Sequence, residues 1–172
     1  MASKFKTIYY SLFTIHVFLF LAGCGYTTKS TLPEHIRSIS ISPIKNATPQ
    51  PGVNHALSSA LSQRFGQDPR FQVVGREGAD AVLEGTVIGY SSEGVAFDRS
   101  DIASRFRLRI VFRFSFVEKG GNILIGDEQL VGEAFYPGGG DIAALKAAEE
   151  QASRRAIVDL AEATYQRIRE GL

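Results

Sequence analysis

The sequence predicts an α+β fold, a two-layer sandwich in which two helices pack on one face of a mixed four- to five-stranded sheet. Two observations lead to this prediction. The segment 105–117 places bulky apolar residues at every second position, which is the period of a strand. Two other segments, one after Gly52 and one after Asp141, repeat apolar residues at helical spacing. The predicted order is strand, helix, strands, hairpin, helix.

The first half of the chain supplies a strand, a helix and two further strands. Residues 36–42 alternate apolar and polar side chains toward their end, which predicts a strand with one buried face. Pro43 and the turn-forming cluster at 46–52 end it. An amphipathic helix follows and stops near the next glycine. Its apolar positions are Val53, Ala56, Leu57, Ala60, Leu61 and Phe65. Segments rich in β-branched residues then predict a short strand at 71–74 and a longer one at 79–90.

The strand at 105–117 is expected to carry an aromatic face and an arginine face, because successive side chains point to opposite sides of a sheet. Its even positions hold Phe106, Leu108, Ile110, Phe112, Phe114 and Phe116. Its odd positions include Arg105, Arg107, Arg109 and Arg113. We therefore expect Phe112 and Phe114 to point into the core.

Residues 119–121 form a loop of hairpin type, so 122–136 is expected to return antiparallel to the arginine strand. A three-residue loop pairs residues whose numbers sum to about 240. The expected pairs are Phe116 with Leu124, Ile110 with Leu130, Arg113 with Asp127 and Arg107 with Glu133. The two opposite-charge pairs are worth roughly 0.2–1 kcal/mol each and favour this register.

Asp141 follows a proline and three glycines and can cap a final helix. This helix spans roughly 28 residues, which corresponds to about 42 Å. Its apolar stripe is rich in alanine, so the helix can lie close to a sheet that carries bulky phenylalanines. The stripe consists of Leu145, Ala148, Ala152, Ala156, Leu160 and Ala163.

The N-terminus has the parts of a secretory signal. Two lysines precede an apolar run at 8–21, and small residues lead to the only cysteine, Cys24. The run of about 14 residues is shorter than the ~20 of a membrane-spanning helix. Residues 21–24 resemble a bacterial lipobox, in which the cysteine sulfur takes a diacylglycerol and becomes the new N-terminus. We expect a signal peptide at 1–23, a lipidated tether at 24–35 and a single α+β domain at 36–172.

Composition and motifs exclude several classes of function for this protein. Two of the 19 basic residues are removed with the signal, which leaves 17 against 18 acidic ones. The mature chain therefore has no net positive charge that would attract nucleic acid. A lipidated Cys24 leaves no thiol for a disulfide or a metal site. Motifs of serine hydrolases, zinc proteases, phosphate loops and dinucleotide sites are absent from the sequence. We therefore predict no catalytic residue, metal site or cofactor, and a lipid-anchored hydrolase is disfavoured.

The arginine row at 105, 107, 109 and 113 has two interpretations. It is either the solvated, ion-paired outer face of the sheet, with Asp127 and Glu133 as partners, or a surface that recognises anions or a partner protein. Guanidinium groups bind phosphate or carboxylate in bidentate fashion, so the second interpretation fits a phosphorylated glycolipid or an acidic protein wall.

Several segments together resemble the lipopolysaccharide-assembly lipoprotein family, LptE. They are "CGY" after the lipobox, "LPEHIRSISISPIKNATPQPGV", "ADAVLEGTV", the arginine strand with its hairpin, and "EAFY" before the last helix. The resemblance implies a non-enzymatic lipoprotein that plugs a large outer-membrane β-barrel, LptD. It also implies lipopolysaccharide binding, assistance in barrel assembly, and the same fold of two helices on a small sheet. Gly25 is not acidic, unlike an inner-membrane retention signal, so the expected location is the outer membrane.

The resemblance also implies two ligand-binding residues. Basic residues that contact the ligand in related proteins lie before the central strand and near the start of the last helix. Arg99 and Lys146 occupy those places here. Without the resemblance they would be a solvated loop arginine and a surface helix lysine. The alternative function is that of another envelope-assembly lipoprotein, acting as an activator or a secretion accessory.

Overall fold

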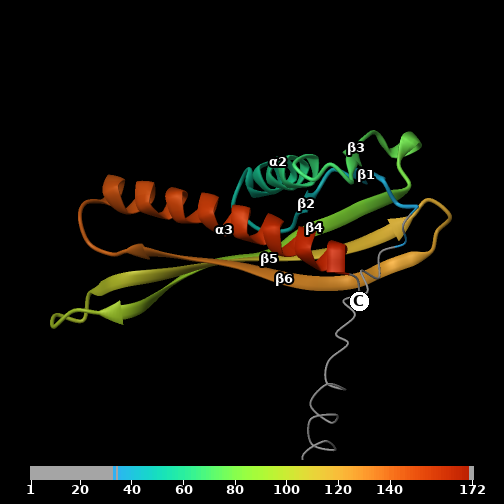
Figure 1. Cartoon of the computed structure of the whole chain (residues 1–172). Helices are drawn as coiled ribbons and strands as arrows, with labels where there is room; N and C mark the ends of the chain where they lie inside the picture. The colour runs from blue at the N-terminus through green and yellow to red at the C-terminus, as the bar shows by residue number, and fades with distance from the viewer. Residues whose placement is uncertain (1–32, 34, 171–172) are drawn as a thin grey trace, which may run out of the picture.

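Two helices cover one face of a mixed sheet, as predicted (Figure 1). The computed structural model describes residue 33 and residues 35–170. The lipobox, with Cys24, and the signal peptide at 1–23 lie outside the described residues, as does most of the tether. The elements are β1 (Ser38–Ile41), β2 (Lys45–Asn46), α2 (Val53–Gly66), β3 (Gln72–Val73), the 3₁₀ helix η1 (Arg76–Gly78), β4 (Ala81–Phe97), β5 (Ala103–Glu118), β6 (Ile123–Pro137) and α3 (Ile142–Glu170).

The sheet has six strands, because β2 adds a short strand to the predicted set. Its main order is β3-β1-β4-β5-β6, and β2 pairs with β4 beyond the end of β1. Strands β1 and β2 run parallel to β4, whereas β5 runs antiparallel to both of its neighbours, β4 and β6. Lys45–Asn46 is too short to show alternation, and it lies within a segment whose proline and polar residues predict a turn.

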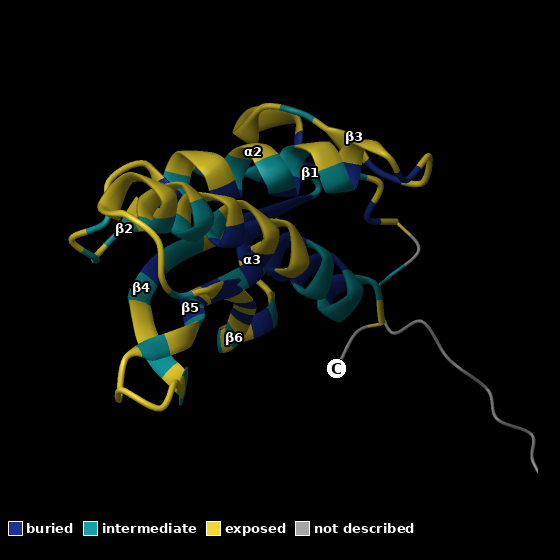
Figure 2. Ribbon diagram, turned by 90° about the vertical axis from the view of Figure 1, so that its left-hand side faces the viewer, coloured by how far each residue is buried: buried dark blue, intermediate teal, exposed yellow. Residues whose placement is uncertain are grey.

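The core lies between the helices and the even-numbered face of β5 (Figure 2). Phe112, Phe114 and Phe116 are at most 1% exposed, which confirms the predicted direction of the aromatic face. The rings of Phe112 and Phe114 stack with centroids 5.6 Å apart. Helix α2 contributes four buried residues, Val53, Leu57, Leu61 and Phe65. The odd-numbered side chains of β5 lie on the opposite face, which no helix covers; we call it the open face.

Helix α3 lies unusually close to β6. Ala152 and Ala156 of α3 are fully buried, as the alanine stripe predicted. The matching feature on the sheet is Gly132, where an added Cβ would lie 2.3 Å from the Ala156 carbonyl oxygen and 2.9 Å from the Leu160 Cβ. Small residues on both elements therefore set the distance between helix and sheet.

The predicted hairpin register is correct only at the turn. Val117 pairs with Ile123 as the loop length requires, but β6 then contributes two extra residues at successive irregularities near Asp127, which has a φ of +48°. The expected pairs of Phe116 with Leu124, Ile110 with Leu130 and Arg107 with Glu133 are therefore wrong. Their observed counterparts are Phe116 with Ile125, Phe112 with Leu130 and Arg109 with Glu133. Between the two irregularities one residue is inserted, so Ile125 is buried opposite Phe116 in place of Leu124. Beyond Asp127 both residues are inserted, and the side chains keep their predicted faces.

Candidate functional site

Three of the four arginines on the open face have close partners. The Arg107 Nε donates a hydrogen bond of 2.9 Å to Glu93, and this bond raises the pKa of Arg107. The Arg109 Nε lies 2.8 Å from Glu133, an ion pair without hydrogen-bond alignment. The Arg105 guanidinium lies over the Phe135 ring, 4.4 Å from its centroid. Much of the charge in this row is thus engaged within the molecule.

Arg113 is held more loosely than Arg109. Its Nε lies 3.5 Å from the Asp127 carboxylate, and the Asp127 side chain is 80% exposed. The charge pair predicted between these two residues is therefore present, although Arg113 pairs along the backbone with Gln129. The long distance and the solvent exposure leave the guanidinium available to a further acceptor.

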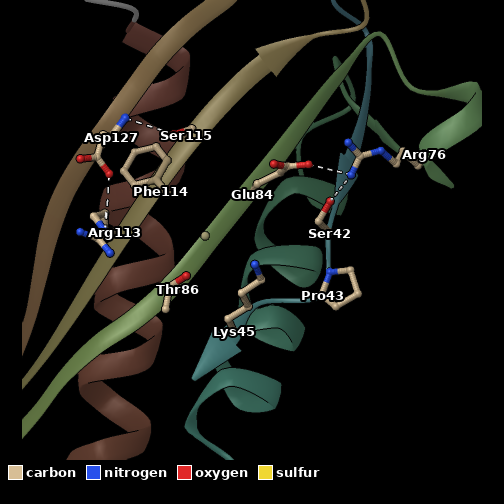
Figure 3. Close-up of a pocket in the computed structure, with 11 residues that line it drawn as sticks. Ser42, Pro43, Lys45, Arg76, Glu84, Thr86, Arg113, Phe114, Ser115 and Asp127 are labelled. Carbon is tan, nitrogen blue, oxygen red and sulfur yellow. Dashed lines mark hydrogen bonds and ion pairs between the residues drawn. The ribbon is translucent and has the colours of Figure 1, made fainter. Parts of the chain in front are cut away.

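Arg113 borders a cleft of about 500 Å³ on the open face (Figure 3). Lys45 and Thr86 line it beside Arg113, and Figure 3 shows the lysine and the arginine on either side of the threonine. At the far end Arg76 donates to Glu84 at 2.7 Å and to the Ser42 hydroxyl at 3.1 Å. This cleft could not be predicted from the sequence, since it depends on β2 lying beside β4.

Lys146 lines a second groove, of about 340 Å³, between the start of α2 and the first half of α3. At its base the Tyr90 hydroxyl donates to Glu149 at 3.3 Å, and burial raises the pKa of Tyr90. Arg154 also lines the groove, whereas Arg99 does not. The two implied ligand-binding residues therefore belong to different local surfaces.

Arg99 lies in the turn that joins β4 to β5 and is exposed. Asp98 organises this turn: its carboxylate accepts hydrogen bonds from the backbone N–H of Ser100 at 2.8 Å and of Ile102 at 3.0 Å. The Asp98 carboxylate is thus engaged by the backbone next to Arg99. The turn projects from the same end of the molecule as the start of α3, where Lys146 lies (Figure 1).

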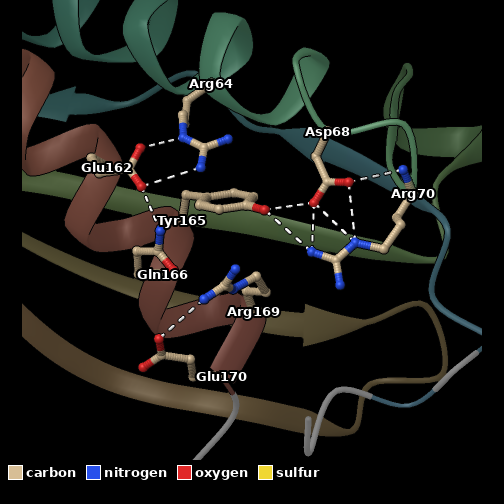
Figure 4. Close-up of polar contacts among 8 residues, drawn as sticks. All are labelled: Arg64, Asp68, Arg70, Glu162, Tyr165, Gln166, Arg169 and Glu170. Atoms are coloured by element: carbon tan, nitrogen blue, oxygen red, sulfur yellow. Dashed lines mark hydrogen bonds and ion pairs between the residues drawn. The ribbon is translucent and has the colours of Figure 1, made fainter.

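A partly buried polar cluster, not foreseen from the sequence, joins the end of α2 to α3 (Figure 4). Asp68 is 8% exposed and accepts hydrogen bonds from Arg70 at 2.7 Å and from the Tyr165 hydroxyl at 2.5 Å. The Arg70 hydrogen bonds hold the pKa of Asp68 well below its usual range. Arg64 lies over the Tyr165 ring and pairs with Glu162. Because these groups satisfy one another, we interpret the cluster as structural.

Other site chemistry is sparse in the part of the chain that the structure describes. No group of three or more histidine, cysteine, aspartate or glutamate residues in that part is arranged to hold a metal. His35 contacts Glu118 at 2.6 Å, and His55 is exposed on α2. None of the described helices combines the length and hydrophobicity needed to cross a membrane.

Solved structures with a similar fold include lipoproteins of three bacteria. A lipoprotein B of Nitrosomonas europaea has a TM-score of 0.59 at 15% identity, over 80% of this chain and 84% of that one. The rare lipoprotein B of Shewanella oneidensis has a TM-score of 0.54 at 11% identity, over 76% and 92%. A minor lipoprotein of Acinetobacter baumannii has a TM-score of 0.52 at 18% identity, over 79% and 92%. At these identities the likeness concerns the fold.

The family assignment comes from the sequence. No curated protein matches the chain. The sequence model of the LptE family, described as lipopolysaccharide-assembly, matches residues 36–168, which include all six strands and both long helices except the last two residues of α3. The resemblance noted in the sequence is thereby confirmed: the chain belongs to the LptE family of lipopolysaccharide-assembly lipoproteins.

Proposed function

We propose that this protein is an outer-membrane lipoprotein, anchored through Cys24, that plugs the β-barrel LptD, assists its assembly and binds lipopolysaccharide for delivery to the cell surface. It acts by binding and not by catalysis. The observation that carries the proposal is the family match at 36–168, since it spans nearly the whole described domain.

The open face supports the plug. A β-barrel wide enough to enclose a domain has a polar interior, so a plug needs a polar surface that does not demand desolvation of unpaired charge. The part of the open face around Arg107 and Arg109 meets this need, because Glu93 and Glu133 neutralise these arginines and no helix covers them. The face can therefore approach a polar wall at small electrostatic cost.

Arg99 and Lys146 supply the proposed lipopolysaccharide contact. Both are exposed, and neither takes part in an ion pair with any other described residue. Phosphate groups on the glycolipid are anions that guanidinium and ammonium groups bind. Contacts of this exposed kind weaken as salt screens them.

The test is a paired assay on an Arg99→Gln/Lys146→Gln variant. Lipopolysaccharide capture and co-purification of the barrel are measured separately, from solubilised outer membrane. We expect capture to fall and barrel co-purification to persist. The control is Arg37→Gln/Lys119→Gln, which removes the same charge from two exposed sites away from both grooves.

Two results would contradict the proposal. Undiminished capture by the double variant would refute the two-residue assignment. Co-purification of a periplasmic enzyme or a secretin-like ring in place of a barrel would favour an activator or secretion accessory instead.

A further inference from the structure

Lys45, Thr86 and Arg113 form a transverse row on the open face. Lys45 is the register partner of Thr86 in the parallel pairing of β2 with β4, and Thr86 is the partner of Arg113 in the antiparallel pairing of β4 with β5. Adjacent strands lie about 4.8 Å apart, so the Cα atoms of the two cations are about 10 Å apart. Their side chains are long enough to reach one ligand above the threonine, and Figure 3 shows them on either side of Thr86.

This row differs from the rest of the open face in its unneutralised charge. Lys45 forms no ion pair with any residue that the structure describes, and it is exposed. Arg113 has only the 3.5 Å contact with the exposed Asp127. By contrast, Arg76 at the other end of the cleft is held by both Glu84 and the Ser42 hydroxyl.

The cleft exists because the sheet edge is interrupted there. β1 pairs with β4 as far as Ile41, opposite Leu83, and β2 resumes the pairing at Lys45, opposite Thr86. The intervening segment contains Pro43, which has no N–H to donate to the ladder. The chain leaves the sheet edge and returns to it with Lys45 at the rim of the cleft.

We infer that this cleft binds the carboxylate of an aspartate or glutamate from the protein that covers the open face, held between the Lys45 ammonium and the Arg113 guanidinium. The inference rests on the proposed function, in which that protein is the barrel. The Thr86 hydroxyl lies between the two cations and can donate to the same carboxylate.

The charge of the cleft favours a carboxylate over a phosphate. Three cationic side chains (Lys45, Arg76, Arg113) and two anionic ones (Glu84, Asp127) line it, which leaves an excess of one positive charge. One carboxylate neutralises that excess. A phosphate carries up to two negative charges and would face the Glu84 and Asp127 carboxylates on either side, where like charges repel.

The experiment measures retention of the barrel on tagged Lys45→Gln and Arg113→Gln variants and on the double variant, during washes of increasing salt. We expect each single variant to lose the barrel on the order of tenfold faster than the unaltered protein. The double variant should lose the barrel only slightly faster than either single variant, because both cations hold the same carboxylate. Lys119→Gln is the matched control and should behave like the unaltered protein, because Lys119 lies outside the cleft.

A second measurement does not depend on binding energy. A photocrosslinking residue at position 45 should form a covalent crosslink to the barrel. The same residue at position 119 is the control. Thermal melts of each variant establish that the domain is still folded.

The outcomes separate this contact from the plug itself. Unchanged retention of the barrel by folded Lys45→Gln and Arg113→Gln would overturn the carboxylate contact and leave the proposed function standing. Reduced lipopolysaccharide capture with unchanged barrel retention would assign the cleft to a glycolipid phosphate and would also overturn it. Absence of a barrel partner for the unaltered protein would overturn the proposed function and this contact together.

Discussion

Substitution of Gly132 by alanine should destabilise the domain through a clash with helix α3. The added Cβ would lie 2.3 Å from the Ala156 carbonyl oxygen, about 1 Å short of ordinary van der Waals contact, which begins near 3.4 Å. The obstacle is helix backbone, so no side-chain rotation relieves it, and α3 must move away from β6. Overpacking of this kind costs about 1–3 kcal/mol. For a domain of this size the midpoint of thermal unfolding should fall by roughly 3–10 °C.

The assay is thermal and urea unfolding of the domain, with two matched variants. Gly120→Ala is the neutral control, because a Cβ there meets nothing within 4 Å. Ala156→Gly combined with Gly132→Ala tests the geometry: it should not rescue stability, since the close atom is the carbonyl oxygen and not the alanine methyl. Equal stabilities of the Gly132→Ala and Gly120→Ala proteins would refute the close approach of α3 to β6.

Three further predictions concern the core, acid stability and the anchor. Phe112→Ala and Phe114→Ala should each cost roughly 3–5 kcal/mol, and Arg109→Ala less than about 1 kcal/mol, in urea unfolding; the reverse ranking would contradict the face assignment. Hydrogen bonds from Ser38 and Arg37 lower the pKa of Asp80 from 3.8 to about 2. The stability that this carboxylate contributes should thus be complete above its unfolded pKa and should decline as the pH falls toward 2. In the Asp80→Asn protein, the urea midpoint should therefore differ less between about pH 5 and about pH 3 than it does in the unaltered protein. Cys24→Ser should yield uncleaved precursor or soluble protein on fractionation; unchanged cleavage and membrane retention would exclude the lipobox.

The elements best predicted from the sequence are those whose pattern is long and one-sided. The alternation over 105–117 predicted both a strand and its buried face, and the alanine stripe of α3 did the same for a helix. Such patterns arise because one face of the element is buried. The second half of β4 was not predicted as strand, because residues 91–97 are mostly polar or small and do not alternate apolar with polar side chains. They are strand because β5 pairs with them along its whole length.

The hairpin register and the cleft could not be predicted from local pattern. Loop length fixes the register only beside the turn. Gly126 is a residue type that occurs at bulges, but neither it nor Asp127 shows how many residues the irregularities insert. Lys45 reads as part of a turn, and its position beside Thr86 follows from a parallel pairing across a long sequence separation. The polar cluster around Asp68 was missed for the same reason, since Arg70 and Tyr165 are distant in sequence.

The helix-covered face of the sheet stabilises the fold, whereas the open face is the one that we propose for recognition. The helix-covered face contains the buried aromatic and aliphatic side chains, so substitutions there change the free energy of unfolding by several kcal/mol. Exposed ion pairs on the open face contribute about 0–1 kcal/mol each, so their removal leaves the domain folded. A contact with a partner is different, because it buries those same charges and makes their pairing matter more. Substitutions on the open face should therefore alter retention of a partner without altering unfolding, and this difference makes Lys45 and Arg113 informative positions to change.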